Sequence, residues 1–282
     1  MKDRYLSFFF LLSLVLLLPQ AAAAQRVERI FPAPPGTVLE IVNLNGQVVV
    51  QGWDRPQVRV VGVRRSGAVE IHMKDVASQI HIHTHLLQTD VPPSERTVNY
   101  EIWAPPYISL IAKLETGSLR VENISEVITV ETVVADVLLR NLSGHISVET
   151  MNGSVQVERC SGRMEVTSIS GSLRFLQPRT RRLIAKTTSG DIYFAGSLLR
   201  AAAYKFYNHE GNIELLLPAN ASFELTANSI KGQVYNDFPL TPSSHGRLPQ
   251  RSYERSLFGT VHSGEAMVQV TSFSGTIRIR AQ

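Results

Sequence analysis

Cysteine is nearly absent from the sequence: Cys160 is the only one among 282 residues. A single thiol cannot form an internal disulfide, so packing and hydrogen bonding must hold the fold together. Cys160 also occupies a repeat position that is apolar in neighbouring units. We therefore expect a small buried residue there and not a reactive thiol, which would need an accessible and electropositive site.

Charged and aromatic residues are also scarce. Charged residues make up 18% of the chain and aromatic residues 7%, and the formal net charge is +4. A nucleic-acid-binding face needs dense basic residues with stacking aromatics, and the tightest basic cluster is Arg179, Arg181 and Arg182. We therefore expect no nucleic-acid partner. The sequence also lacks a phosphate-binding glycine loop and a nucleophile elbow, so we expect no cofactor.

Long hydrophobic runs are missing except at the N-terminus. Lys2 and Arg4 precede the apolar residues 8–18, and a run of small alanines ends at Ala24. This order is typical of a secretory signal peptide, and the apolar run is shorter than the roughly 20 residues that a bilayer crossing needs. We predict cleavage near Ala24 and export, with an uncleaved anchor as the alternative. The mature chain should contain no transmembrane span.

What the sequence does contain is a nine-residue repeat from Gly117 to Phe175. Each unit starts at a marker residue and carries apolar side chains two, four and seven positions later. The +2 and +4 positions alternate with polar residues, which is typical of a strand with one buried face. We expect the +7 side chains to face the core as well. They are Ile124, Val133, Leu142, Met151, Cys160 and Ile169.

The units fall into two alternating sets, so that similar units recur at every second repeat. Stacking like units on like predicts an all-β fold, a single-stranded parallel β-solenoid (β-helix) with coils of about 18 residues. Right-handed winding is the expectation for parallel crossovers. The alternative is an antiparallel sandwich, because regular turn spacing also suits that architecture.

The repeat markers are mostly glycines, each preceded by a small polar residue, which predicts a turn. Glu126 and Ala135 fill two of the marker positions. The predicted structural turn glycines, inside and outside the regular stretch, are Gly46, Gly117, Gly144, Gly153, Gly162, Gly171, Gly190, Gly211, Gly232 and Gly275.

These patterns also divide the chain. We expect a signal peptide at residues 1–24, a Pro-rich lead-in at 25–36 and one solenoid domain at 37–282. Within that domain, the regular coils occupy residues 117–194. Residues 66–114 depart from the repeat and should form an irregular insert or an antiparallel N-terminal capping region, because solenoid ends need caps.

Several segments resemble a known family. They are the opening NLNGQVVVQGWDRPQVRV, the repeated T-x-x-G-x-[VIL]-x-[VF] pattern and the final TVHSGEAMVQVTSFSGTIRI. Together they are similar to the bacterial putative-adhesin domain family, over residues 38–279. The resemblance implies an exported bacterial β-solenoid of unknown function, located in the periplasm or at the cell surface, and it brings no binding residues with it.

Two groups of polar residues are candidate sites. In the segment around residue 80, His81, His83 and His85 alternate with apolar residues and should share one face of a strand. Two such histidines with further ligands could bind zinc, and His72 could supply one. The alternative is an outer face that happens to be rich in imidazole.

Stacking like units on like places Glu131 beside Glu149. Such a pair could bind a cation or act as a general acid and base, and the alternative is a solvated face. The same stacking aligns Glu122, Arg140 and Glu158 in a ladder of alternating charge.

The sequence therefore favours an exported, non-enzymatic β-solenoid that acts as an adhesin-like binding or scaffolding module at the bacterial cell envelope. Its partner would be an unidentified envelope protein or polysaccharide. The alternative is a carbohydrate-active enzyme, a polysaccharide lyase or hydrolase, built on the same fold.

Overall fold

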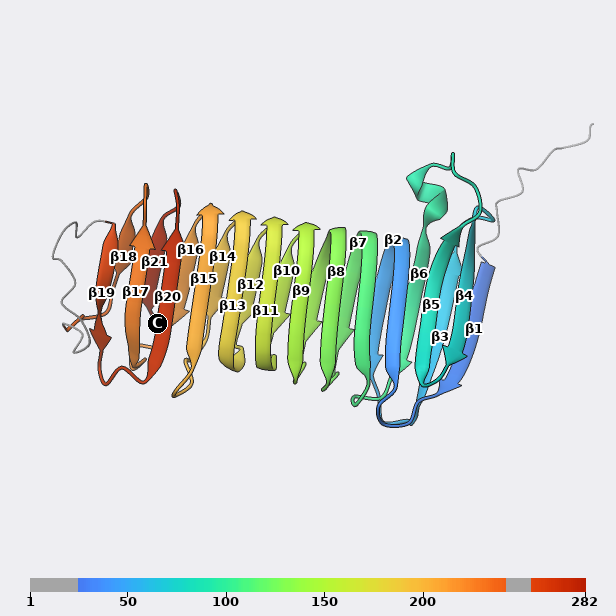
Figure 1. Ribbon diagram of the computed structural model, residues 1–282, viewed down its shortest axis with the longest axis horizontal. Coiled ribbons are helices and arrows are strands. Elements are labelled where there is room, and N and C mark those ends of the chain that lie inside the picture. The colour runs from blue at the N-terminus through green and yellow to red at the C-terminus, as the bar shows by residue number, and fades with distance from the viewer. Residues whose placement is uncertain (1–24, 242–254) are drawn as a thin grey trace, which may run out of the picture.

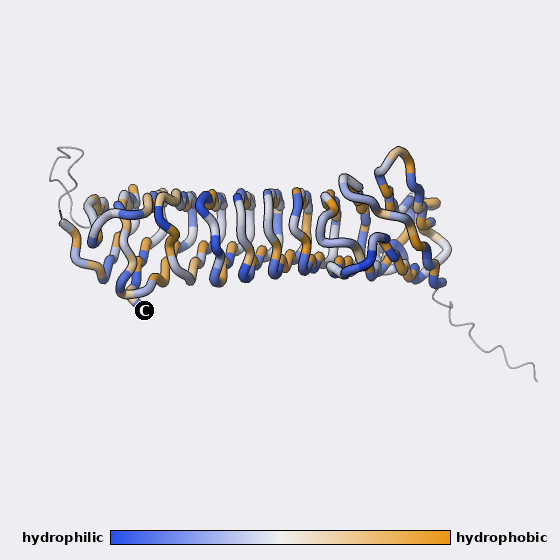
Figure 2. The backbone as a smooth tube through the Cα atoms, turned by 90° about the horizontal axis from the view of Figure 1, so that it is seen from below, coloured by the Kyte–Doolittle hydropathy of each residue, from blue (hydrophilic) through white to orange (hydrophobic). Residues whose placement is uncertain are grey.

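The chain forms an elongated all-β body, as predicted (Figure 1). The computed structural model describes residues 25–241 and 255–282, and the predicted signal peptide, residues 1–24, lies outside the described residues. Two rows of strands run along the length of the body, and most coils are stacked as a series of similar loops (Figure 2). Within the described ranges, no helix has the length and apolar character that a bilayer crossing requires.

The described residues contain 21 strands and one short 3-10 helix. In chain order they are β1 (Gln25–Pro32), β2 (Val38–Gly52), β3 (Gln57–Arg64), β4 (Val69–Val76), β5 (Gln79–Leu86), η1 (Pro93–Arg96), β6 (Val98–Ala104), β7 (Ser109–Glu122), β8 (Val127–Arg140), β9 (His145–Asn152), β10 (Val155–Glu158), β11 (Ser161–Ser170), β12 (Leu173–Leu176), β13 (Arg179–Ser189), β14 (Ile192–Ala195), β15 (Ala203–Glu210), β16 (Ile213–Leu217), β17 (Phe223–Ser229), β18 (Val234–Asn236), β19 (Ser256–Val261), β20 (Ala266–Ser272) and β21 (Ile277–Ala281).

The central strands pair in parallel, and each residue lies beside its equivalents in the coils before and after it. Val155 of β10 lies between Val137 of β8 and Leu173 of β12. In the same way, β8, β9 and β11 pair in parallel one after another. Because the offset between paired residues equals the predicted coil length, equivalent residues of successive coils form columns. These parallel strands make the middle of the body solenoid-like.

The coils present two outer faces. The long face consists of β5, β9, β11, β13, β15, β20 and β17 together with the first halves of β2, β7 and β8. The short face consists of β10, β12, β14, β16 and β21 together with the second halves of β2, β7 and β8. The strands β2, β7 and β8 continue from one face to the other across the corner.

Antiparallel strands lie at both ends of the body. At the N-terminal end, β5 pairs with β4, and β3 pairs with both β6 and β1. Antiparallel pairing therefore occurs at the N-terminal end, but β5, β6 and β7, which lie wholly or partly in residues 66–114, also pair in parallel with β2. Residues 25–32, within the expected lead-in, form strand β1, because β3 offers an edge on which every residue of the segment finds a partner.

The C-terminal end is ordered differently from the sequence. The last two strands, β20 and β21, insert between the coil of β15 and β16 and the coil of β17 and β18. Strand β19 then pairs antiparallel with β17 at the edge of the long face. The sequence pattern did not indicate this insertion, because the repeat shows which residues are strands and not the order in which the end coils stack.

The core lies between the two faces and follows the +2 and +4 positions. Val137 and Val155 are buried, and so are the aromatic rings of Phe175, Phe194 and Phe206 towards the C-terminal end. Cys160 is also buried, as expected, and its burial raises the pKa of its thiol to about 11.

The prediction that all +7 side chains face the core is wrong for one of the two sets. Ile124, Leu142 and Cys160 are buried, whereas Val133, Met151 and Ile169 are 43%, 53% and 52% exposed. The backbone explains the difference. At +6 in the first set, Asn123, Asn141 and Arg159 adopt positive φ angles of 60°, 52° and 49°, and this turns the next residue inward.

In the second set the strand continues past +6 without such a turn. The side chains at +6, Thr132, Thr150 and Ser168, are buried there. Side chains alternate between the two sides of a strand, so the side chains at +7 in these half-coils must point into solvent.

Glycine is required at Gly117 for two reasons. Its φ is +124°, which disfavours any residue with a Cβ. A Cβ at this position would also clash with the carbonyl oxygen of Gly46 in the neighbouring coil. At Gly275 the lack of room for a Cβ is enough to require glycine. Its φ is not in the left-handed region, but a Cβ there would clash with the carbonyl oxygen of Gly211.

The substitution Gly117→Ala should therefore lower the free energy of unfolding by about 2 kcal/mol or more, through backbone strain and steric overlap. Gly67→Ala is the matched control, because a Cβ at Gly67 meets open space. Urea unfolding followed by circular dichroism measures both. Equal midpoints for the two variants would show that the coils do not approach each other at Gly117.

A second pair of variants tests the two kinds of +7 position. Leu142→Ala should cost about 2–5 kcal/mol, because it leaves a cavity in the core. Met151→Ala should change the free energy of unfolding by about 0.5 kcal/mol or less, because its side chain is exposed. Similar losses in the two variants, measured by urea unfolding, would mean that both residues point into the core.

Candidate functional site

Exposed and half-buried apolar side chains form a row on the long face, with one break. We call Leu44, Val133, Met151 and Ile169 the apolar row. The register of the paired strands sets them side by side, since Thr132 is paired with Thr150 and Thr150 is aligned with Ser168. Glu115 lies in the same column, between Leu44 and Val133. The row exists because the +7 side chains of this set point outward.

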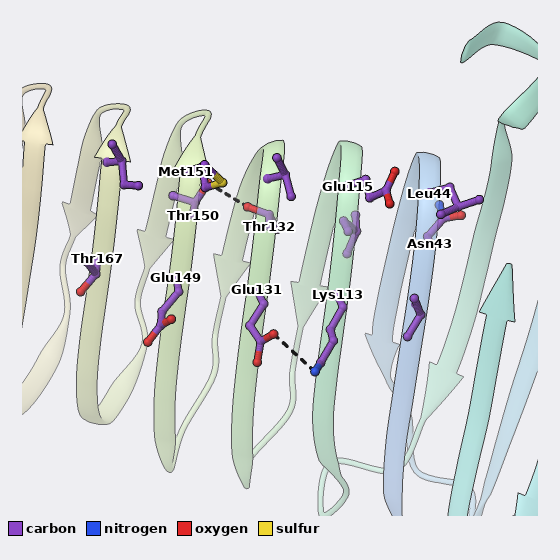
Figure 3. A pocket seen from close by; sticks show the side chains of 14 residues that line it. Asn43, Leu44, Lys113, Glu115, Glu131, Thr132, Glu149, Thr150, Met151 and Thr167 are labelled. Atoms are coloured by element: carbon purple, nitrogen blue, oxygen red, sulfur yellow. Dashed lines mark hydrogen bonds and ion pairs between the residues drawn. The ribbon is translucent and has the colours of Figure 1, made fainter. Parts of the chain in front are cut away.

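The apolar row borders a shallow groove of about 520 Å³. The opposite side of the groove is the outward +5 column, which runs through Lys113, Glu131, Glu149 and Thr167 (Figure 3). The inward-pointing side chains at +6 lie between the two columns, and Thr132 donates a hydrogen bond of 2.8 Å to Thr150 there. The groove therefore runs along the stack of coils and crosses the strands.

Glu131 and Glu149 face the groove from adjacent coils, in direct register. The Glu131 carboxylate lies 3.4 Å from Nζ of Lys113, and the side chains of Lys113 and Glu131 are 44% and 49% exposed. Glu149 makes no ion pair with any other described residue. With Glu115, the groove thus has three carboxylates and one lysine on its rims. It is a surface of apolar and acidic character.

The predicted charge ladder lies on the short face. Arg140 Nε donates to Glu158 Oε2 at 2.7 Å, and its Nη1 donates to Glu122 Oε1 at 3.4 Å. The hydrogen bond from Arg140 lowers the pKa of the Glu158 carboxyl. Because these charges satisfy one another, the ladder joins three coils and leaves little for a ligand to bind.

The histidine-rich segment is strand β5, at the N-terminal end of the long face. Glu40 of β2 is in register with His81, and His83 follows on the same side of β5. Glu40 Oε2 lies 2.7 Å from His81 Nδ1 and 3.3 Å from His83 Nε2. Burial raises the pKa of the Glu40 carboxyl, but its hydrogen bonds to His81 and His83 lower the pKa more.

The other two histidines lie beside this cluster. His72 of β4 pairs across the strands with His83, and its ring centroid is 4.4 Å from that of His85. His72 Nε2 also lies 2.9 Å from Glu70 Oε2. The ring centroid of His85 is 6.0 Å from that of His83. The structure therefore brings His81 and His83 together with Glu40, and it places His85 with His72 and Glu70.

Sequence reasoning missed two features of this region. Glu40 was missed because it lies far from His81 along the chain, and nothing local indicates that β2 pairs with β5. The apolar row was missed because all +7 positions look alike in the repeat. The buried threonines at +6 were a usable signal for the row, since a strand that continues through +6 must turn +7 outward.

Comparison with solved structures finds chains of similar length and low identity. An adhesin from Bacteroides fragilis, described as putative, is 12% identical, with a TM-score of 0.49 over 91% of this chain and 97% of that one. A putative adhesin from Parabacteroides distasonis is 11% identical, with a TM-score of 0.46 over 92% and 98%. A putative lipid binding protein from the same species is 9% identical, with a TM-score of 0.38 over 92% and 98%.

No curated protein matches the chain. A family model does: the one for the Toastrack domain of unknown function DUF4097 matches residues 70–280, about three quarters of the sequence. The match covers the strands from β4 to β21, including most of the apolar row, the charge ladder and the histidine strand. The chain therefore belongs to the Toastrack DUF4097 family.

Proposed function

We propose that this protein is an exported, non-enzymatic binding module of the bacterial cell envelope, and that it holds an extended partner along the groove. The observation that carries the proposal is the apolar row. Single exposed apolar residues are common on protein surfaces, but Val133, Met151 and Ile169 are exposed in three consecutive coils. A contiguous apolar strip of this kind marks an interaction surface.

The chemistry of the groove favours a polypeptide partner that carries apolar and basic side chains. Apolar side chains of the partner would pack on the row, at a spacing of about 4.8 Å per coil. Basic side chains would pair with Glu115 and Glu149, which have no lysine or arginine partner among the described residues. None of the residues that line the groove is aromatic, so a sugar ring would find no ring to stack on. An envelope protein therefore fits the groove better than a polysaccharide.

The fold and domain organisation that we propose follow from the sequence and the pairing together. Residues 37–282 would form one right-handed parallel β-solenoid domain, with residues 66–114 in its cap and 117–194 in its regular coils, and strand β1 would add to its N-terminal end. One continuous core cluster reaching from Phe31 to Ile279 supports a single domain. The right-handed winding is inferred from the strong preference of parallel crossovers for that hand. Export is inferred from the signal peptide expected at residues 1–24.

A carbohydrate-active enzyme is the second candidate, and one observation favours it. Glu131 and Glu149 sit on neighbouring strands about 4.8 Å apart, which is close to the spacing of the two carboxyl groups in retaining glycosidases. A general acid, however, needs a carboxyl held protonated by a desolvating environment. The Glu131 side chain is 49% exposed and is paired with Lys113, so the column suits binding better than catalysis.

The proposal can be tested with two synthetic peptides of equal length, one alternating leucine with lysine and the other leucine with glutamate. Fluorescence anisotropy should show binding of the leucine–lysine peptide, which matches both the row and its carboxylates. Met151→Ser combined with Ile169→Ser should weaken that binding about tenfold or more, because burying one such side chain contributes about 1.5–3 kcal/mol.

Met267→Ser is the matched control, since Met267 is 63% exposed on the long face but lies outside the groove. The control should bind like the unmodified protein. Equal binding of the two peptides, or equal effects of the control and the groove variants, would contradict the proposal. Release of sugar products from envelope polysaccharide that stops in Glu131→Gln or Glu149→Gln would support the enzyme instead.

A further inference from the structure

A cluster of three ligand-type side chains lies at the N-terminal end of the long face, beyond the groove. Glu40, His81 and His83 offer one carboxylate oxygen and two imidazole nitrogens, and these three atoms all lie within 4.8 Å of one another. All three side chains are partly buried, with exposures of 25% for Glu40 and 31% for each histidine. The cluster is thus shielded from bulk solvent on one side and open on the other.

The sheet holds these residues in place. Side chains two residues apart on a strand point to the same side, which brings His81 and His83 together. Strand β5 pairs in parallel with β2, and Glu40 stands directly beside His81 in that register. Three ligands therefore come from two hydrogen-bonded strands and none from a loop, so the site needs little reorganisation to bind an ion.

We propose that Glu40, His81 and His83 form a binding site for a divalent transition-metal ion of the zinc class. Zinc takes imidazole nitrogen and carboxylate oxygen at about 2.0–2.2 Å. Two ligand atoms of one tetrahedrally coordinated ion then lie about 3.3 Å apart. The Glu40–His83 distance is 3.3 Å, and the Glu40–His81 distance is 2.7 Å. The Glu40–His81 pair must open by about 0.6 Å to reach this value, and the ligand nitrogens of His81 and His83 lie within 4.8 Å of each other.

Two histidines and one glutamate fill three positions of a four-coordinate ion. The fourth position would be left to water or to a ligand group from a partner. The harder oxygen-seeking ions, magnesium and calcium, prefer all-oxygen sites. The imidazole content of the cluster therefore selects transition metals.

The charged groups around the cluster are consistent with this assignment. Lys74 of β4 pairs with His81 across the strands, but it is exposed and can extend into solvent. On the other flank, His72 Nε2 contacts the Glu70 carboxylate at 2.9 Å. His85 belongs to that second group through its contact with His72. The three proposed ligands therefore adjoin the remaining histidines of β4 and β5, since His72 is in register with His83, and the contacts to Glu40 set them apart.

The test is calorimetric titration of zinc chloride into the protein purified without a polyhistidine tag, at pH 7.5. We expect one zinc ion per chain and a higher melting temperature with zinc than with EDTA. Glu40→Gln and His83→Asn should each weaken binding at least about tenfold, by the scale of losses at such sites. Lowering the pH to 5.5 should weaken binding of the unmodified protein, because imidazoles bind metal only when neutral.

Two controls separate this site from other histidines. His145→Asn changes a histidine of the long face outside the cluster, and the double variant His72→Asn, His85→Asn removes the neighbouring pair. Both should bind zinc like the unmodified protein. Melting in EDTA shows whether each variant is folded, and only folded variants are compared.

The proposal is overturned if the unmodified protein binds none of zinc, copper(II) or nickel(II) saturably. It is also overturned if loss of His72 and His85 abolishes binding while Glu40→Gln leaves it unchanged. Binding of the leucine–lysine peptide to the groove is a separate measurement, so failure of the metal site would leave the proposed binding role standing.

Discussion

The parallel hydrogen-bonded register between coils is the constraint on which the rest of the structure depends. Because each regular coil repeats the one before it, every position of the repeat becomes a column along the body. In a column of alternating charge, such as Glu122, Arg140 and Glu158, each charge forms an ion pair with its neighbour in the next coil. A column of exposed apolar residues has no such internal pairing, so the register turns a local repeat into a long exposed apolar strip.

Within this register, the backbone at one position decides which side chains are buried. A left-handed residue at +6, such as Asn141, turns Leu142 into the core. A buried threonine at +6, such as Thr150, leaves the strand extended and puts Met151 outside. The two half-coils therefore share a sequence pattern and differ in function: one closes the core, and the other supplies the apolar row and the groove.

The sequence was sufficient for the all-β class, the coil length, the charge ladder and most strand positions, because all of these follow from local periodicity. It was not sufficient where the answer depends on which strands pair. The register of β2 with β5 brings Glu40 to His81 and His83, and the insertion of β20 and β21 orders the C-terminal coils. The exposure of Met151 could have been predicted in principle. The polar residue Thr150 before it indicates a strand that continues through +6, although the apolar pattern makes all +7 positions look alike.

The distance between two positions of one outward column tests this account most directly. Nitroxide labels on cysteines introduced by Val133→Cys and His209→Cys should react readily, while the native Cys160 is buried and protected. The two positions are four coil steps apart in the register, so electron–electron resonance should give a narrow distribution centred at about 19 Å, at about 4.8 Å per step. Slow labelling at Val133→Cys, or a distribution centred beyond about 30 Å, would contradict the stacking of the coils and the outward direction of the apolar row.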